Sequence, residues 1–105
     1  MDGHCLVLIT CGESEEAREI ARYLVESGLA AGGQIVPIES IYRWGGEIVE
    51  DHEWLILVKT HRDLFLKIES IVHEMHSYEV PPVLMLAMDA ASRPYLDWIT
   101  ENTGG

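Results

Sequence analysis

The sequence predicts an α+β fold built on a four-stranded antiparallel sheet, and three features agree on it. The order of expected elements is strand, helix, strand, strand, helix, strand, helix, which matches a split βαβ unit with one helix added. Residues 5–10 and 54–58 are unbroken apolar runs of strand length. Gly45 and Gly46 separate two β-rich stretches and predict a tight hairpin turn. We therefore expect a ferredoxin-like sandwich with a long β-hairpin and an extra C-terminal helix, forming a single domain across residues 1–105.

The hairpin turn sets the pairing of the two arms. It places Trp44 opposite Glu47, Tyr42 opposite Val49, Ser40 opposite Asp51, and Ile38 opposite Glu53. Each arm of roughly a dozen residues would span about 40 Å at about 3.4 Å per residue. A compact chain of this size is only about 33 Å across, so the hairpin should extend beyond its own domain. The alternative is a bulge near Pro37 that shortens the arm.

The first helix should follow the strand at residues 5–10. Ser14 is a suitable N-cap, and Glu15 and Glu16 favour the positive end of the helix dipole. Gly28 is placed to end the helix. The apolar positions repeat at helical spacing: Ala17, Ile20, Ala21, Leu24 and Val25.

The remaining elements are expected after the hairpin. Thr60 with Asp63 resembles a capping box for a second helix. The apolar face of that helix would hold Leu64, Ile68, Ile71, Val72 and Met75. A last strand should cover residues 80–88, with its prolines at the start, where a missing N–H does least harm. Ser92 and Pro94 then open a short amphipathic helix.

The expected sheet leaves apolar surface uncovered. In the split βαβ topology the first and third strands are central, and here they are apolar on both faces. Two helices cover only one face of such a sheet. Together with the overhanging hairpin, this predicts a homo-oligomer packed sheet against sheet.

Composition restricts the possible partners. The chain has 18 Asp and Glu against 7 Lys and Arg, a net charge of −11. Such a balance repels phosphate backbones, so we expect no nucleic-acid partner. It attracts cations, although high acidity also serves solubility alone. The sequence shows no signal peptide or membrane span, which predicts a cytoplasmic protein with no membrane contact whose Cys5 and Cys11 are free thiols.

Two groups of side chains could carry chemistry. Glu69, His73 and His76 fall on one side of the second predicted helix, and two imidazoles with a carboxylate suit Zn²⁺ or Cu²⁺. A solvated helix face is the simpler interpretation for His73, whereas His76 lies at the helix end, where another segment can meet it. The second group comprises residues 76–79, Lys59, Tyr42, Trp44, Glu50, Asp51 and Glu53. It is either a structural ion pair around Lys59 or an inter-subunit pocket for a metal, a small anion or acid–base work.

Several segments resemble the CutA family of divalent-cation tolerance proteins. They are residues 40–51, Glu53, Lys59 with Thr60, residues 76–81 and residues 95–98. The resemblance implies a very stable, PII-like homotrimer whose hairpins clasp neighbouring subunits, with a cleft between protomers near His76. It also implies copper binding and tolerance to divalent metals, with no established enzymatic activity.

The chain departs from the family pattern at two places. Gly32 stands where many members carry a cysteine proposed as a copper ligand, and Ser77 replaces the usual proline after His76. Cys11 lies close to the position of a cysteine that some relatives carry. The loss of a thiol disfavours binding of Cu(I), while binding of Zn²⁺ or Cu²⁺ at His76 remains compatible with the sequence.

The leading hypothesis is a trimeric, non-enzymatic divalent-metal protein linked to copper tolerance. Its metal candidates are His76, Glu79 and Glu53, with Glu53 supplied by the next protomer. The alternative is a PII-like signalling or scaffold trimer that binds a small ligand between subunits, with Tyr42, Trp44, Lys59 and Tyr78 as candidates. An enzyme ranks below both because no recognisable nucleophile motif is present.

Overall fold

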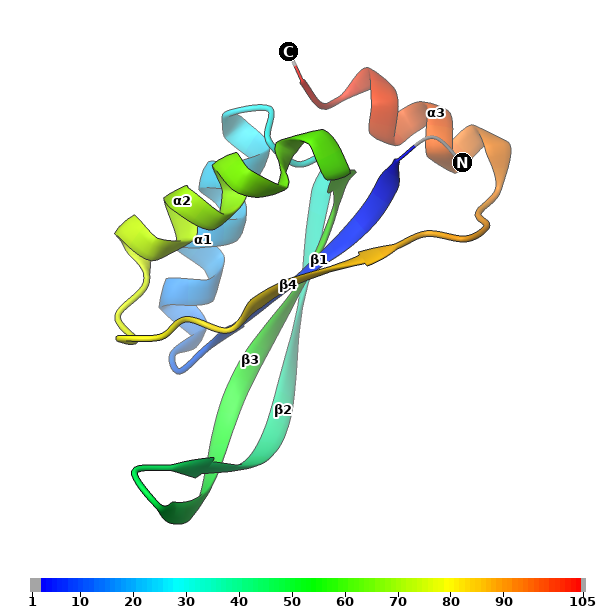
Figure 1. Cartoon of the computed structure of the whole chain (residues 1–105). Helices are drawn as coiled ribbons and strands as arrows, with labels where there is room; N and C mark the ends of the chain where they lie inside the picture. Colours follow the sequence, from blue (N-terminus) through cyan, green and yellow to red (C-terminus); the bar gives the residue numbers. More distant parts are fainter. Residues whose placement is uncertain (1–2, 105) are drawn as a thin grey trace.

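The computed structural model describes residues 3–104 and has the predicted α+β architecture (Figure 1). The elements are β1 (His4–Cys11), α1 (Ser14–Glu26), β2 (Gly32–Trp44), β3 (Glu47–His61), a 3₁₀ turn η1 (Arg62–Leu64), α2 (Phe65–Met75), β4 (Val83–Ala87) and α3 (Arg93–Glu101). The strands form one sheet in the order β2-β3-β1-β4, and every neighbouring pair is antiparallel. The central strands are therefore β1 and β3, as the ferredoxin-like topology predicted.

The hairpin has the predicted turn and the predicted register. Gly45 and Gly46 adopt φ values of 60° and 82°, which side chains other than glycine rarely tolerate. All four predicted cross-strand pairs are present. Pairing continues through Pro37, which lies opposite Trp54, so the bulged alternative is wrong.

The hairpin also projects beyond the rest of the molecule. The strand β1 pairs with β3 only from Trp54 to His61. Residues 38–53 therefore form a two-stranded ribbon on their own, visible below the sheet in Figure 1. The molecule measures 44 × 25 × 21 Å, an elongation that this ribbon explains.

The core lies between one face of the sheet and the helices α1 and α2 (Figure 1). The sheet contributes Cys5, Val7, Ile9, Cys11, Ile56 and Val58, and the helices contribute Ala17, Ile20, Leu24, Ile68 and Val72. Both cysteines are buried free thiols, as predicted. The burial of Ile68 and Val72 confirms the expected apolar face of the second helix.

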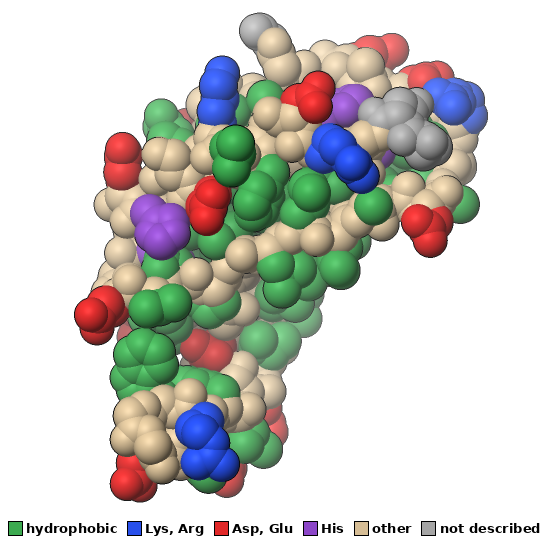
Figure 2. All heavy atoms as spheres, viewed as in Figure 1, with side chains coloured by type: hydrophobic (Ala, Val, Ile, Leu, Met, Phe, Trp, Pro, Cys, Tyr) green, Lys and Arg blue, Asp and Glu red, His purple; other side chains and the backbone are tan. Residues whose placement is uncertain are grey.

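The other face of the sheet is largely open. Side chains alternate along a strand, so Leu6, Leu8 and Leu57 point away from the helices, and each is only half-buried. On β4, Leu84 and Leu86 are 48% and 49% exposed. Figure 2 shows apolar side chains alongside this part of the sheet and along the projecting hairpin. The uncovered apolar face expected from the sequence is therefore present.

The predicted N-caps of the first two helices are wrong. The N-cap of α1 is Glu13 rather than Ser14, which is already the first helical residue. Thr60 belongs to β3, where its hydroxyl donates a hydrogen bond of 2.7 Å to the carbonyl oxygen of Leu29. The helix α2 begins only after the 3₁₀ turn that contains Asp63. A threonine followed by an acidic residue does not identify a cap when the strand before it continues.

The other helix ends and the last strand follow the sequence more closely. Gly28 lies just after the C-cap of α1 with φ of 77°, as its predicted role requires. Ser92 is the N-cap of α3, and Pro94 lies in its first turn. The strand β4 starts at Val83 rather than residue 80, immediately after two prolines that have no N–H to donate to a ladder.

Candidate functional site

His76 connects α2 to the C-terminal end of β1. It is the C-cap of α2 and has extended backbone angles, φ −81° and ψ 142°. Its Nε2 lies 2.6 Å from the carbonyl oxygen of Thr10, and its Nδ1 accepts a hydrogen bond of 3.0 Å from the backbone N–H of Tyr78. A carbonyl only accepts, so the proton of the neutral ring is on Nε2. His76 is 8% exposed, and these two bonds hold its imidazole in one orientation.

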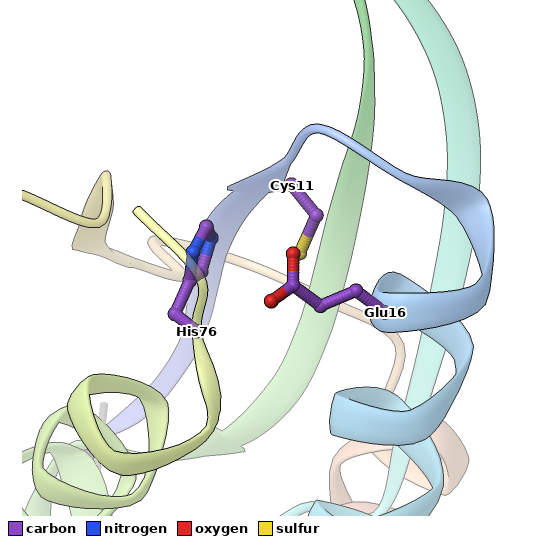
Figure 3. A group of neighbouring side chains, drawn as sticks. All are labelled: Cys11, Glu16 and His76. Carbon is purple, nitrogen blue, oxygen red and sulfur yellow. The ribbon is translucent and has the colours of Figure 1, made fainter. Parts of the chain in front are cut away.

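Two further metal-binding side chain types converge on this imidazole. Cys11 ends β1 and Glu16 lies in the first turn of α1 (Figure 3). One ligand atom from each of Cys11, Glu16 and His76 lies within 4.8 Å of the other two. The carboxylate of Glu16 also accepts hydrogen bonds from the backbone N–H and the hydroxyl of Ser77, at 2.6 and 3.1 Å. The loop after α2 is thereby fastened to α1.

In the absence of a bound cation, the thiol of Cys11 keeps its proton. Burial, followed by the negative charges of Glu16 and Glu53, raises the pKa of Cys11 to about 12. The two nearby carboxylates favour a positive charge placed beside them. A bound metal ion would reverse this effect and deprotonate the thiol.

The donor set fits a borderline divalent ion. One imidazole nitrogen, one thiolate sulfur and one carboxylate oxygen are ligands of Zn²⁺ and Cu²⁺, and a water molecule can complete four-coordination. Binding would require one nitrogen of His76 to exchange its present hydrogen bond for the metal. The ligand atoms must also move slightly closer together than 4.8 Å.

Within one protomer, the carboxylates predicted to join His76 are not ligands of the Cys11 group, and the supply of Glu53 by a neighbouring protomer stays a prediction. Glu53 is 4% exposed and accepts a hydrogen bond of 2.6 Å from the hydroxyl of Tyr78. Glu79 is exposed. Neither belongs to the group around Cys11. His76 does not join Glu69 and His73 on the helix face, because its ring bonds to the carbonyl oxygen of Thr10 instead.

A cleft of about 520 Å³ lies beside the hairpin. It is lined by Tyr42, Trp44, Glu53, Tyr78, Glu79, Val80 and Pro82. Three of the four residues predicted for a small-ligand pocket thus come together. The fourth, Lys59, does not line this cleft: it is 9% exposed, and its ammonium group donates to the side-chain oxygen of Gln34. Burial lowers the pKa of Lys59.

The two tyrosine hydroxyls at the cleft are both bonded to carboxylates. Tyr42 donates to Asp51 at 2.6 Å, which with slight burial and the nearby acidic charges raises the pKa of Tyr42 to about 12. Burial and the bond to Glu53 raise the pKa of Tyr78 as well. Both phenols therefore remain neutral at physiological pH.

These features define a small ferredoxin-like protein with an overhanging hairpin and an acidic, cation-attracting surface. A family model described as "CutA1 divalent ion tolerance protein" matches residues 5–102. The chain belongs to this CutA1 family, as the resemblance predicted.

Individual relatives agree along nearly the whole chain. The divalent-cation tolerance protein CutA of Thermus thermophilus is 51% identical over 100 residues, covering 94% of this chain and 97% of the relative. A solved structure of the divalent cation tolerance protein from Thermus thermophilus superposes with a TM-score of 0.93 at 50% identity, covering 96% and 99% of the two chains. The solved periplasmic divalent cation tolerance protein CutA from Archaeoglobus fulgidus gives 0.92 at 36% identity, covering 94% and 97%.

Sequence reasoning did not predict Cys11 and Glu16 as partners of His76. The available signal was a cysteine at the end of the first strand followed by an acidic first helical turn. Neither feature indicates that a residue more than 60 positions later packs against them. Within residues 3–104, no helix is long and apolar enough to cross a membrane.

Proposed function

We propose that this protein is a non-enzymatic homotrimer that binds divalent metal ions directly. This binding would provide tolerance to such ions. The observation that carries the proposal is the convergence of Cys11, Glu16 and His76, whose ligand atoms lie within 4.8 Å of one another. Membership of a family described by divalent ion tolerance supports it. The group differs from the predicted ligand set, since it keeps His76 and takes its carboxylate from α1 of the same chain.

The mixed donors favour Zn²⁺ or Cu²⁺ over Cu(I). A single thiol is a poor site for Cu(I), which prefers several soft ligands. The second thiol, Cys5, lies near the other end of β1, six residues from Cys11 along an extended strand. The raised pKa of Cys11 also supports a non-enzymatic role, because a protonated thiol is a weak nucleophile.

The open face of the sheet supports assembly. Large apolar side chains on the hairpin are exposed, with Ile41 at 71% and Ile48 at 60%. The leucines Leu84 and Leu86 of β4 are exposed as well, and exposed apolar side chains in number mark interaction surfaces. The partner we propose is a second copy of this chain, since most soluble oligomers form between identical subunits.

A metal titration of the stripped protein tests this function. Native mass spectrometry of chelator-treated protein should show a trimer that takes up about one Zn²⁺ or Cu²⁺ per protomer. His76→Ala, Cys11→Ser and Glu16→Gln should each weaken uptake by about tenfold or more. Glu15→Gln is the matched control, since Glu15 occupies the same helical turn and is exposed.

Two outcomes would count against the proposal. Unchanged affinity in all three ligand variants would remove the metal site from this group. A trimer that stays empty at saturating metal would exclude direct binding as the function, while leaving the assembly intact.

A cytoplasmic location is also proposed, because both described cysteines are free thiols, a state typical of reducing compartments. The relative from Archaeoglobus fulgidus is described as periplasmic, so a periplasmic location is the alternative. Fractionation of cells expressing the native gene tests this point. The alternative function, a PII-like signalling trimer, is supported by the cleft but not by Lys59, which lies outside its lining.

A further inference from the structure

The cleft beside the hairpin has a distinctive chemical lining. Three aromatic rings and two carboxylates surround it, with Val80 and Pro82 completing the wall. Among the described residues, those that line the cleft include no lysine, arginine or histidine. The rings come from Tyr42 and Trp44 on β2 and from Tyr78 in the loop after α2, so strand and loop meet at this point.

Hydrogen bonding removes the donors that an anion would need. Both tyrosine hydroxyls are committed to carboxylates, Tyr42 to Asp51 and Tyr78 to Glu53, each at 2.6 Å. Side chains at the cleft therefore offer aromatic rings and carboxylate lone pairs, with the indole N–H of Trp44 as a remaining donor. An anionic ligand would meet the charges of Glu53 and Glu79 without compensation.

Ring faces distinguish one kind of cation from another. The face of an aromatic ring is electronegative and attracts a cation, most strongly on tryptophan. A methylated ammonium group is weakly hydrated and can rest against such faces, whereas a small metal ion keeps its water. A cleft of about 520 Å³ also lies within the range of pockets for small organic ligands.

We propose that this cleft is a binding site for an organic ammonium cation, held by the rings of Tyr42, Trp44 and Tyr78 and by the carboxylates of Glu53 and Glu79. This site adjoins the metal-binding group through the ring contact of Tyr78 with His76, but the two share no residue. Of the ligands expected for the predicted pocket, this lining disfavours the small anion, because Lys59 lies outside it.

Calorimetric titration with choline chloride in metal-free buffer tests the proposal. The matched probe is the neutral alcohol in which carbon replaces the choline nitrogen, which has the same shape without the charge. Choline should bind saturably. The neutral alcohol should bind with an affinity lower by about tenfold or more, which corresponds to a difference of about 1.4 kcal/mol or more. Cys11→Ser should leave choline binding unchanged, so this site and the metal site succeed or fail separately.

Variants locate the site. Trp44→Ala and Glu53→Gln should each reduce choline affinity by about fivefold to tenfold, while Trp44→Phe should retain much of it. Glutamine at this position still accepts the hydrogen bond of Tyr78, which protects the fold. Glu50→Gln is the charge-matched control, because Glu50 is on the same strand and alternation places it on the other face.

Three results would overturn the proposal. Choline and its neutral analogue could bind equally, which would show a merely apolar cleft. Glu50→Gln could weaken choline as much as Glu53→Gln, which would show a general effect of net charge. Absence of saturable choline binding to the assembled protein would show that the cleft takes no organic ammonium ion, as expected if a neighbouring protomer fills it.

Discussion

The buried thiol of Cys11 should resist ionisation far beyond the ordinary range. Its pKa rises from 9.0 to about 12, through burial first and then through Glu16 and Glu53. A change of this size lowers the thiolate fraction roughly a thousandfold at any pH below the ordinary value. A group whose proton is held more tightly in the folded state stabilises that state at low pH. The contribution is fully present below pH 9.0 and is lost as the pH rises towards about 12.

An equilibrium titration measures this directly. Cysteine labelled with ¹³C at its β carbon, in a Cys5→Ser background, reports the state of Cys11 through its NMR chemical shift. In the folded protein the shift should keep its thiol value at about pH 10, where an ordinary thiol is mostly ionised. The same protein in denaturant should titrate near 9.0.

Two variants separate the causes of the raised pKa. Glu16→Gln should lower the pKa of Cys11 because it removes the carboxylate with the larger effect, while Glu15→Gln should leave it unchanged. Addition of Zn²⁺ at neutral pH should produce the thiolate shift if the metal binds here. A folded-state midpoint near 9.0 would refute the reasoning, since neither burial nor the carboxylates would then act on this thiol.

Two further predictions concern the fold and the assembly. Thr60→Val should lower the free energy of unfolding by about 1–2 kcal/mol because the carbonyl of Leu29 loses its hydrogen-bond donor. Thr60→Ser keeps the hydroxyl and loses only a methyl group, so it should lower the free energy of unfolding by about 0.8 kcal/mol or less. Denaturant titration at fixed protein concentration measures both, and equal losses would assign the effect to the methyl group. Leu86→Asp should shift the assembly towards monomer, whereas Leu66→Asp, on an outward position of α2 that is 75% exposed, should not. Light scattering over a dilution series checks this, and an unchanged mass for Leu86→Asp would contradict packing through the open face.

The strand register and the buried face of α2 were predictable because they depend on residues close together in the sequence. The glycines at 45 and 46 fix a two-residue turn, and the period of two along each arm then assigns every partner up to Ile38 and Glu53. The apolar repeat of α2 likewise identified the buried Ile68 and Val72. These features concern neighbours in sequence or partners counted from a turn.

The candidate site was harder to predict because it depends on contacts between distant segments. Nothing local to His76 shows that its ring would bond to Thr10, or that Glu16 would hold the following serine. Lys59 lies outside the pocket predicted for it for a related reason. Its strand and face were predictable, but its choice of the neutral Gln34 over a carboxylate depends on a diagonal neighbour across the sheet.

In the proposed assembly, the projecting ribbon at residues 38–53 ties local order to protein concentration. An isolated two-stranded hairpin is marginally stable in water, and this one has no third strand beside it. Its amide hydrogens should therefore exchange quickly with solvent in a dilute, separated protomer and slowly once neighbours cover it. Because Tyr42 and Trp44 lie on this ribbon, dilution would also dismantle one wall of the cleft. Ligand affinity measured there would then fall together with assembly, although no residue of the cleft had changed.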